Sequence, residues 1–172
     1  MADINILVPI IDKISQYQTP GKKVLQKLVY LIEKKGLDLG YDYAIHYYGP
    51  YCAKLDDAVH SLEMQGMVSI KPERMSHKIY LAAGVGTDNY ALSSEDEKLI
   101  DEALKVFASL SAHDLELLTT TDFIARELFR RQNTCSDQDI VEGVRTIKGE
   151  KFSSEKIYET IAQLKDNGYG WN

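Results

Sequence analysis

Residues Leu25–Tyr51 read LQKLVYLIEKKGLDLGYDYAIHYYGPY, and this stretch decides the fold. Its apolar residues recur at helical spacing and predict a helix over Pro20–Lys35 with one buried face. Gly36 is typical of a helix end. The aromatic and aliphatic residues of Tyr41–Tyr48 then favour a strand. That strand should stop at Gly49–Pro50, because proline cannot donate to a strand ladder yet fits the first turn of a helix.

The flanking segments extend this pattern in both directions. A first helix is expected over Asp3–Tyr17, and apolar residues at four-, four- and three-residue spacing predict an amphipathic helix over Tyr51–Gly66. Met67–Ile70 and Lys78–Leu81 are predicted to pair as strands, with Lys71–His77 as the tip. The order of helix, strand, helix and two-stranded hairpin is typical of a winged-helix domain.

The C-terminal half is predicted to be helical. A Gly-rich linker spans Ala82–Leu92, and Ser94 and Glu97 then have the spacing of a capping box. Ser111 and Ser136 are expected to cap two further helices. The fold class is therefore mainly α with a small β-sheet (α+β). A winged-helix-like domain over residues 1–90 should carry a C-terminal helical bundle over 91–172, either as two units or as one compact domain.

Composition limits the class of protein. Of 172 residues, 44% are hydrophobic and 27% are charged, which is ordinary for a globular domain. No apolar run approaches the ~18 residues of a membrane span, and Ile4–Ile14 lacks the features of a signal peptide. Cys52 and Cys135 lie far apart in the sequence and suggest neither a disulfide framework nor a metal site. A cytoplasmic location is expected.

Catalytic and metal-binding motifs are not recognisable in the sequence. The four histidines are scattered, and no zinc, phosphate-loop or nucleophile-elbow pattern occurs. His46, Cys52 and His60 match no common metal spacing. We therefore expect a protein that is not an enzyme and that needs no cofactor. A deep pocket lined by His46, Tyr48 and a carboxylate would revive the catalytic hypothesis.

Tyrosines are concentrated beside the predicted corner at Gly49–Pro50, and that corner is expected to be structural. Tyrosine suits interfaces because it buries an apolar ring and keeps a polar tip. The alternative is a strand with one face in the core. The candidate partner-binding residues are Tyr41, Tyr43, Tyr47, Tyr48 and Tyr51.

Basic residues supply a second candidate surface, which would bind nucleic acid. A lysine stripe is expected on the solvated face of the Pro20–Lys35 helix, and the hairpin tip adds an arginine. The full set is Lys22, Lys23, Lys27, Lys34 and Arg74. The alternative is an ordinary solvated helix face.

The helix before the hairpin argues against the usual DNA docking. In a DNA-binding winged helix this element enters the major groove. Here it carries Lys54 against Asp56, Asp57 and Glu63, and it lacks arginine. Residues 91–172 hold all of the net charge of -6 and should also repel phosphate. A protein partner, basic in character, is therefore preferred over DNA, and a homodimer is compatible with either function.

Five segments carry a family resemblance. LQKLVYLIEKKG, HYYGPY and LEMQGMV resemble the YwgA-like group of uncharacterised prokaryotic proteins, and so do HDLELLTTTDFIARE and KFSSEKIYETIAQLKDNG near the C-terminus. The KLVYL and YGP pairing is similar, more distantly, to the Panacea domain of SocA-like antitoxins. The resemblance implies a compact helical protein without known catalytic residues, and it raises an antitoxin-like or adaptor-like role. Tyr51 after Gly-Pro and the extended C-terminal bundle depart from the Panacea pattern.

Overall fold

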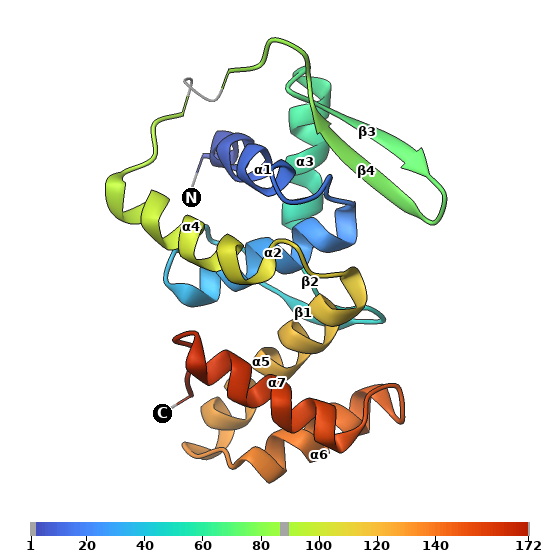
Figure 1. Ribbon diagram of the computed structural model, residues 1–172, viewed down its shortest axis with the longest axis vertical. Helices are drawn as coiled ribbons and strands as arrows, with labels where there is room; N and C mark the ends of the chain where they lie inside the picture. The colour runs from blue at the N-terminus through green and yellow to red at the C-terminus, as the bar shows by residue number, and fades with distance from the viewer. Residues whose placement is uncertain (1–2, 87–89, 172) are drawn as a thin grey trace.

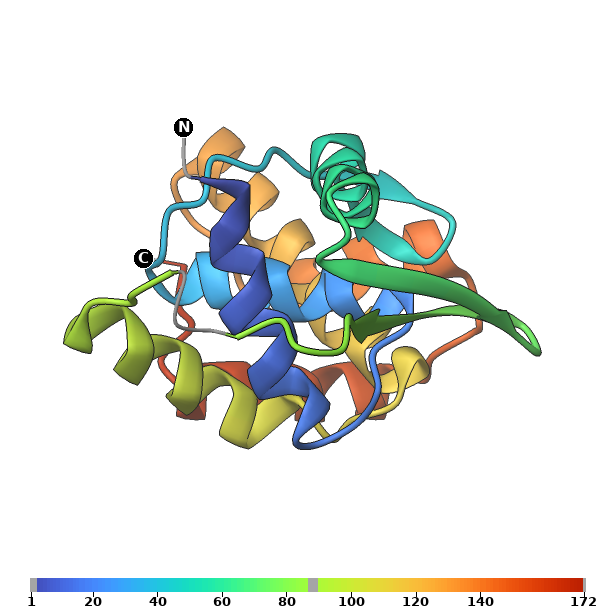
Figure 2. The ribbon, with the colours of Figure 1, turned by 90° about the horizontal axis from the view of Figure 1, so that it is seen from above.

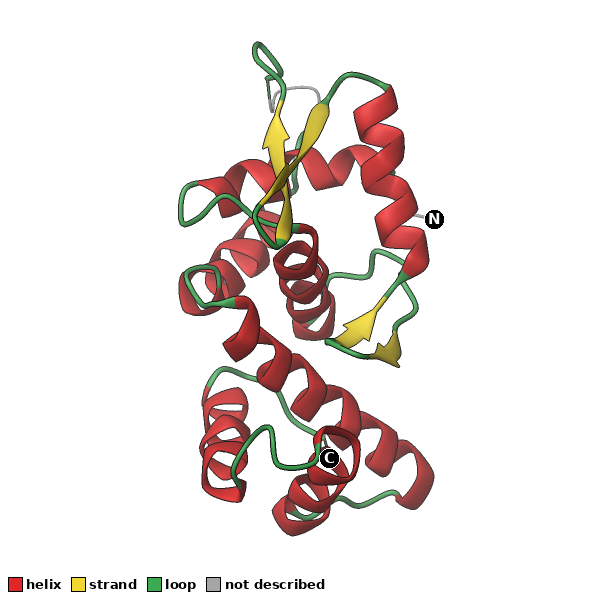
Figure 3. Ribbon diagram, turned by 90° about the vertical axis from the view of Figure 1, so that its right-hand side faces the viewer, coloured by secondary structure: helices red, strands yellow, loops and turns green. Residues whose placement is uncertain are grey.

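The computed structural model describes residues 3–86 and 90–171, and within them the chain is mainly helical with two small antiparallel sheets (Figures 1 and 3). This confirms the predicted mainly α class with a small β component. The elements are η1 (Ile4–Ile6), α1 (Leu7–Ser15), α2 (Lys22–Lys35), β1 (Ala44–His46), β2 (Gly49–Tyr51), α3 (Ala53–Met64), β3 (Val68–Glu73), β4 (Ser76–Leu81), α4 (Ser94–Phe107), α5 (Ala112–Gln132), α6 (Asp137–Lys148) and α7 (Ser154–Asp166).

Helix α2 is the centre of the molecule. Every residue from Val24 to Ile32 is buried, and the helix contacts α3, α4, α5, β2 and β4. A helix that is covered nearly all round belongs to the interior of a fold, not to its surface. The helix ends at Gly36, as predicted, where φ is 140°. The segment just before α2 is joined to the β3–β4 sheet, because Gly21 pairs with Lys78 and the Ile79 N–H donates to the Pro20 carbonyl.

The segment after α2 forms a hairpin and not the single strand that the sequence predicts. β1 pairs antiparallel with β2, and His46 lies opposite Gly49. Tyr47 and Tyr48 form the two-residue turn. The prediction that Gly49–Pro50 ends a strand is wrong, because Gly49 at φ 106° lets the chain reverse and start β2. Pro50 is tolerated in this strand because a two-stranded hairpin has a free edge that needs no donor.

The second hairpin, β3–β4, projects from the body of the molecule (Figure 2). Its strands are longer than predicted, and the tip is reduced to Arg74 and Met75. Arg74 has a positive φ of 54°, as a tight turn requires. Helix α3 precedes this hairpin and is shorter than the predicted Tyr51–Gly66.

Serine caps begin the C-terminal helices. Ser93, Ser111, Ser136 and Ser153 each accept a hydrogen bond from a backbone N–H in the first turn of α4, α5, α6 and α7. The predicted cap at Ser94 is one residue too late, since Ser93 occupies that position. Helices α4 and α5 both pack on α2, so contacts join residues 1–90 to residues 91–172.

The C-terminal tail is anchored in the core. Trp171 is buried, and its Nε1 donates to the Asp122 carboxylate over 3.0 Å. The same carboxylate accepts from the Tyr30 hydroxyl and from Arg126, each over 2.7 Å. Tyr169 donates to the Leu31 carbonyl. The tail therefore closes α5 onto α2. Within the described residues no helix combines the length and the apolar character that crossing a bilayer requires.

Candidate functional site

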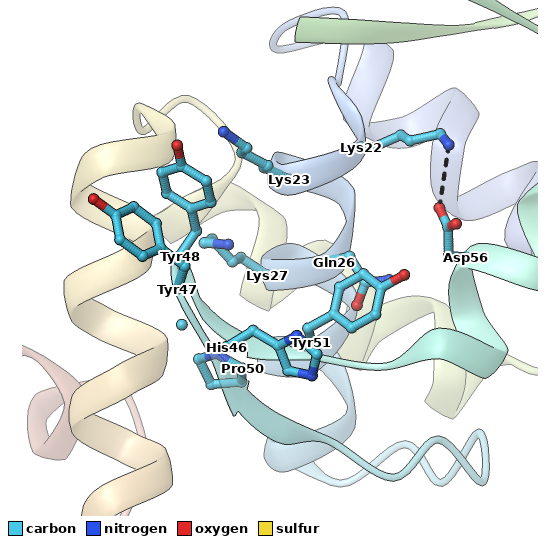
Figure 4. A pocket seen from close by; sticks show the side chains of 11 residues that line it. Lys22, Lys23, Gln26, Lys27, His46, Tyr47, Tyr48, Pro50, Tyr51 and Asp56 are labelled. Carbon is cyan, nitrogen blue, oxygen red and sulfur yellow. Dashed lines mark ion pairs between the residues drawn. The ribbon is translucent and has the colours of Figure 1, made fainter. Parts of the chain in front are cut away.

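A pocket of about 400 Å³ opens between α2 and the β1–β2 hairpin (Figure 4). It contains the predicted corner, most of the predicted tyrosines and most of the predicted lysines. The lining residues are Lys22, Lys23, Gln26, Lys27, His46, Tyr47, Tyr48, Gly49, Pro50, Tyr51 and Asp56.

Two contacts hold the hairpin in place beside α2. The Gln26 side chain accepts from the Cys52 N–H and donates to the Cys52 carbonyl, both over 2.9 Å. On the other side, Gly49 lies against α5, where an added Cβ would come within 3.0 Å of the Thr120 hydroxyl. Glycine is therefore required at this position both for its positive φ and for the close approach. The wall of the pocket is thus fixed from two sides.

The five candidate tyrosines have three different roles. Tyr41 is buried, and half-buried Tyr43 donates to Glu33 over 3.0 Å, so both belong to the scaffold. Tyr51 is half-buried and stacks against His46 on the pocket wall. Only the turn residues are prominently exposed. Tyr47 is 80% exposed and Tyr48 44%.

The tip of the β1–β2 hairpin is held by lysines. The Lys148 ammonium donates to the Tyr47 carbonyl over 2.7 Å. The Lys23 ammonium lies 3.4 Å from the centroid of the Tyr48 ring, which is a close cation–π contact. The two tyrosine rings pack edge to face with their centroids 4.8 Å apart. Both aromatic side chains are therefore presented in fixed positions.

The predicted lysine stripe is not one continuous solvated face. Lys27 is only 3% exposed. Lys22 pairs with Asp56 over 3.4 Å and contacts His60 over 2.8 Å. Lys34 lies 5.5 Å from the centroid of the Tyr30 ring, away from the pocket. The expectation of a solvated face was wrong for Lys27, because the β1–β2 hairpin and the C-terminal helices cover that part of α2. Lys23 is exposed, and Lys22 and Lys34 are half-buried.

A buried carboxylate gathers two further lysines that sequence reasoning missed. Glu116 on α5 is buried and pairs with Lys148 over 3.1 Å and with Lys151 over 2.9 Å. Burial favours the protonated acid, but the hydrogen bonds from Lys151 and Lys148 outweigh it and hold the pKa of Glu116 below its usual value. No local signal marks these residues, because more than a hundred positions separate Lys148 from the tyrosine turn. Folding alone brings them together.

Lys27 differs from its neighbours. Its side chain points from α2 toward the Tyr47–Tyr48 turn (Figure 4). Among the described residues no hydrogen bond or ion pair reaches its ammonium. Burial is the main cause that lowers the pKa of Lys27 from 10.5 to about 8. The charges of Lys148, Lys23 and Lys151 contribute to this net shift, and Glu116 partly offsets it. Among the described lysines that line the pocket, Lys27 is therefore the buried one that has no hydrogen-bonded counter-charge.

The catalytic hypothesis required a pocket lined by His46, Tyr48 and a carboxylate, and these residue types do line this one, with Asp56 as the acid. However, Asp56 is engaged with Lys22 and His60, and His46 stacks on Tyr51. Within the described part of the chain no hydrogen bond joins the three groups. The described residues also contain no cluster of three or more His, Cys, Asp or Glu placed to hold a metal ion.

A second groove of about 910 Å³ adjoins the pocket and shares Lys22 and Lys23 with it. It runs between the start of α2 and the tip of the β3–β4 hairpin, where Arg74, His77 and Lys78 add basic groups to its lining. The lysines at the start of α2 and the arginine of the tip, predicted together, are thus brought to one groove. Lys27 and Lys34 are not among its lining residues.

Helix α3 is less acidic toward solvent than its sequence suggests. Asp56 is half-buried and paired with Lys22, whereas Asp57 is exposed. Glu63 accepts a hydrogen bond from the Ile70 N–H and so supports the start of β3. The exposed charges of α3 thus reduce largely to Lys54 and Asp57.

The family resemblance has no independent support from the comparisons. No protein-family model matches the chain, and no curated protein matches it either.

Proposed function

We propose that this chain is a non-enzymatic protein-interaction module, and that a segment of its partner binds at the Tyr47–Tyr48 turn and the adjoining pocket. The observation that carries the proposal is the pair of exposed tyrosines, 80% and 44% accessible, fixed beside a cavity of about 400 Å³. Tyrosines at protein interfaces supply large contact areas at low entropic cost. Here that cost is reduced further, because Lys148 and Lys23 already hold the turn.

The arrangement of the N-terminal part supports a winged-helix-like architecture for the module. The bridge between Gly21 and Lys78 joins the segment before α2 to β4. In a winged helix a short strand before the second helix pairs with the hairpin in the same way. Helix α3 then precedes the hairpin, as the recognition helix does. In this proposal the β1–β2 hairpin is an insertion between α2 and α3 that supplies the binding surface.

An antitoxin-like or adaptor-like role, which the family resemblance implies, would be one form of such binding. Both roles require recognition of a protein segment and no catalytic group. We also propose a cytoplasmic location, which the two free cysteines, Cys52 and Cys135, support.

The test uses the full-length protein as bait in extracts of its source cell. Tyr47→Ala and Tyr48→Ala baits should lose a specific protein that the unchanged bait retains, and the purified protein should then show the same loss by calorimetry. Tyr158→Ala is the matched control, because Tyr158 is 44% exposed on α7, away from the turn. The proposal fails if the unchanged bait retains no specific protein, or if Tyr158→Ala weakens binding as much as Tyr48→Ala.

The second groove favours DNA binding as the alternative function. Lys22, Lys23, Arg74, His77 and Lys78 line it, with Glu73 as the opposing charge. Binding through phosphates would weaken steeply with salt. We expect an Arg74→Ala and Lys78→Ala double variant to reduce retardation of duplex fragments at low salt. If the unchanged protein retards no duplex at low salt, the alternative is eliminated.

A further inference from the structure

We propose that the pocket receives one carboxylate from an acidic side chain of the partner, and that the Lys27 ammonium binds it. This inference rests on the proposed function and specifies the chemistry of the segment that binds. It also reverses the expectation of a basic partner, which came from the acidic residues of α3.

Among the described residues around the pocket, five lysines face only two carboxylates, so the ion pairs leave three positive charges uncompensated. Lys22 is paired with Asp56 at one end of the cavity. At the other end, Lys148 and Lys151 share the Glu116 carboxylate.

The two lysines that remain are Lys23 and Lys27. Lys23 lies over the ring of Tyr48, whereas Lys27 has no described partner although it is 97% removed from solvent. A buried cation without a hydrogen-bonded counter-charge is unfavourable unless something else supplies that charge.

The charged groups around Lys27 determine which kind of ligand can neutralise its ammonium. Four charged groups act on its ammonium: Lys23 on α2, Glu116 on α5, Lys148 at the end of α6 and Lys151 just after α6. His46 and Tyr48 face the cavity from the hairpin. Three cations and one anion surround Lys27, so an entering anion is attracted.

A carboxylate suits this site better than a phosphate does. The buried group is the single ammonium of Lys27, and one carboxylate is enough to pair with it. A dianionic phosphate would also lie close to the Glu116 carboxylate and be repelled by it. In addition, the lining residues include no arginine to bind a phosphate through two parallel hydrogen bonds.

Proton linkage provides a signature of this binding. A carboxylate favours the charged ammonium, so binding should be strong while Lys27 is protonated and should weaken as the pH rises from 7 to 10. Surface lysines keep their charge over most of this range, because their ordinary pKa is about 10.4. The pH dependence therefore distinguishes Lys27 from general attraction to exposed lysines.

The probe is a fluorescein-labelled hexaglutamate peptide, and its anisotropy is measured with the full-length protein. Hexaglutamine is the uncharged control. We expect hexaglutamate to bind at pH 7 and to bind at least roughly tenfold more weakly at pH 10, as loss of a buried charge partner implies. Lys27→Met should weaken binding by a similar factor at pH 7. Lys98→Met, which removes a lysine whose side chain is 77% exposed on α4, should change it less than about twofold.

Four outcomes would overturn the inference. The first is that hexaglutamate does not bind at pH 7, and the second is that Lys27→Met and Lys98→Met weaken binding equally. The third is that binding is constant between pH 7 and pH 10. The fourth is that inorganic phosphate displaces the peptide at concentrations where acetate has no effect. The comparison of pH values uses the unchanged protein, so it decides the matter even if Lys27→Met misfolds.

The two proposals can fail separately. If hexaglutamate binds through Lys27 but no cellular protein requires Tyr47 and Tyr48 for binding, the proposed function is wrong and the carboxylate site remains supported. If binding of a partner requires Tyr47 and Tyr48 but binding of hexaglutamate does not require Lys27, only the carboxylate assignment is wrong.

Discussion

Replacing Lys27 by methionine should stabilise the protein at neutral pH. Burial lowers the pKa of this ammonium from 10.5 to about 8. A difference of 2.5 pKa units between the unfolded and folded states corresponds to about 3 kcal/mol. The folded state binds the proton more weakly, so the penalty is complete below pH 8 and is relieved as the pH rises from 8 toward 10.5. Methionine has similar length and carries no charge, so it removes this penalty.

Urea unfolding at two pH values tests this prediction. At pH 7 we expect the free energy of unfolding of Lys27→Met to exceed that of the unchanged protein by about 3 kcal/mol, and at pH 10 by about 1 kcal/mol. The control Lys98→Met should stay within about 0.5 kcal/mol at both pH values. A variant that is no more stable than the original at pH 7, or a difference that is the same at pH 10, would refute the reasoning.

Three further predictions concern the scaffold. Gly49→Ala should lower the free energy of unfolding by about 1–3 kcal/mol, because φ is 106° at this position and the Thr120 hydroxyl on α5 would lie 3.0 Å from the new Cβ. The control is Gly170→Ala, which places its Cβ in open space and should leave the free energy of unfolding in urea unchanged. Asp122→Ala should lower the free energy of unfolding by about 3 kcal/mol, because two buried donors and the half-buried Arg126 lose their acceptor. Glu127→Ala at an exposed ion pair should lower it by less than about 1 kcal/mol. Trp171 emission should be blue-shifted and resist acrylamide, and a red-shifted, easily quenched spectrum would contradict the docked tail.

A stabilising substitution in the pocket would itself be informative. Proteins commonly retain destabilising groups where function needs them. If removal of the Lys27 charge stabilises the fold and also abolishes carboxylate binding, the lysine is present for recognition. If it stabilises the fold and leaves binding intact, the carboxylate assignment is wrong.

Locally encoded elements were predicted well. The extent of α2 followed from its apolar spacing and from Gly36, and Ser111 and Ser136 cap helices as expected. The β1–β2 hairpin was missed because its strands have three residues each and its Tyr47–Tyr48 turn lacks the Asn-Gly or Asp-Gly signal of tight hairpins.

The site depends on contacts between distant parts of the chain. The sequence placed Lys27 on an exposed helix face, because the hairpin and α5 that cover it cannot be located from helical periodicity. Likewise Glu116 and Lys148 looked like ordinary charged residues of an acidic C-terminal half. Their pairing at 3.1 Å next to the Tyr47 carbonyl is a product of tertiary structure. The sequence predicted the tyrosines as candidate binding residues, but it did not predict that lysines would surround them.

The most direct test of the account is the protonation of Lys27, followed by NMR on protein labelled at the lysine ε-carbons and assigned with the Lys27→Met variant. The account predicts that the pKa of Lys27 is about 8. A titration near 10.5 would contradict it, because the ammonium would then be solvated or paired, and the pocket would not contain an unmatched charge for a partner to neutralise.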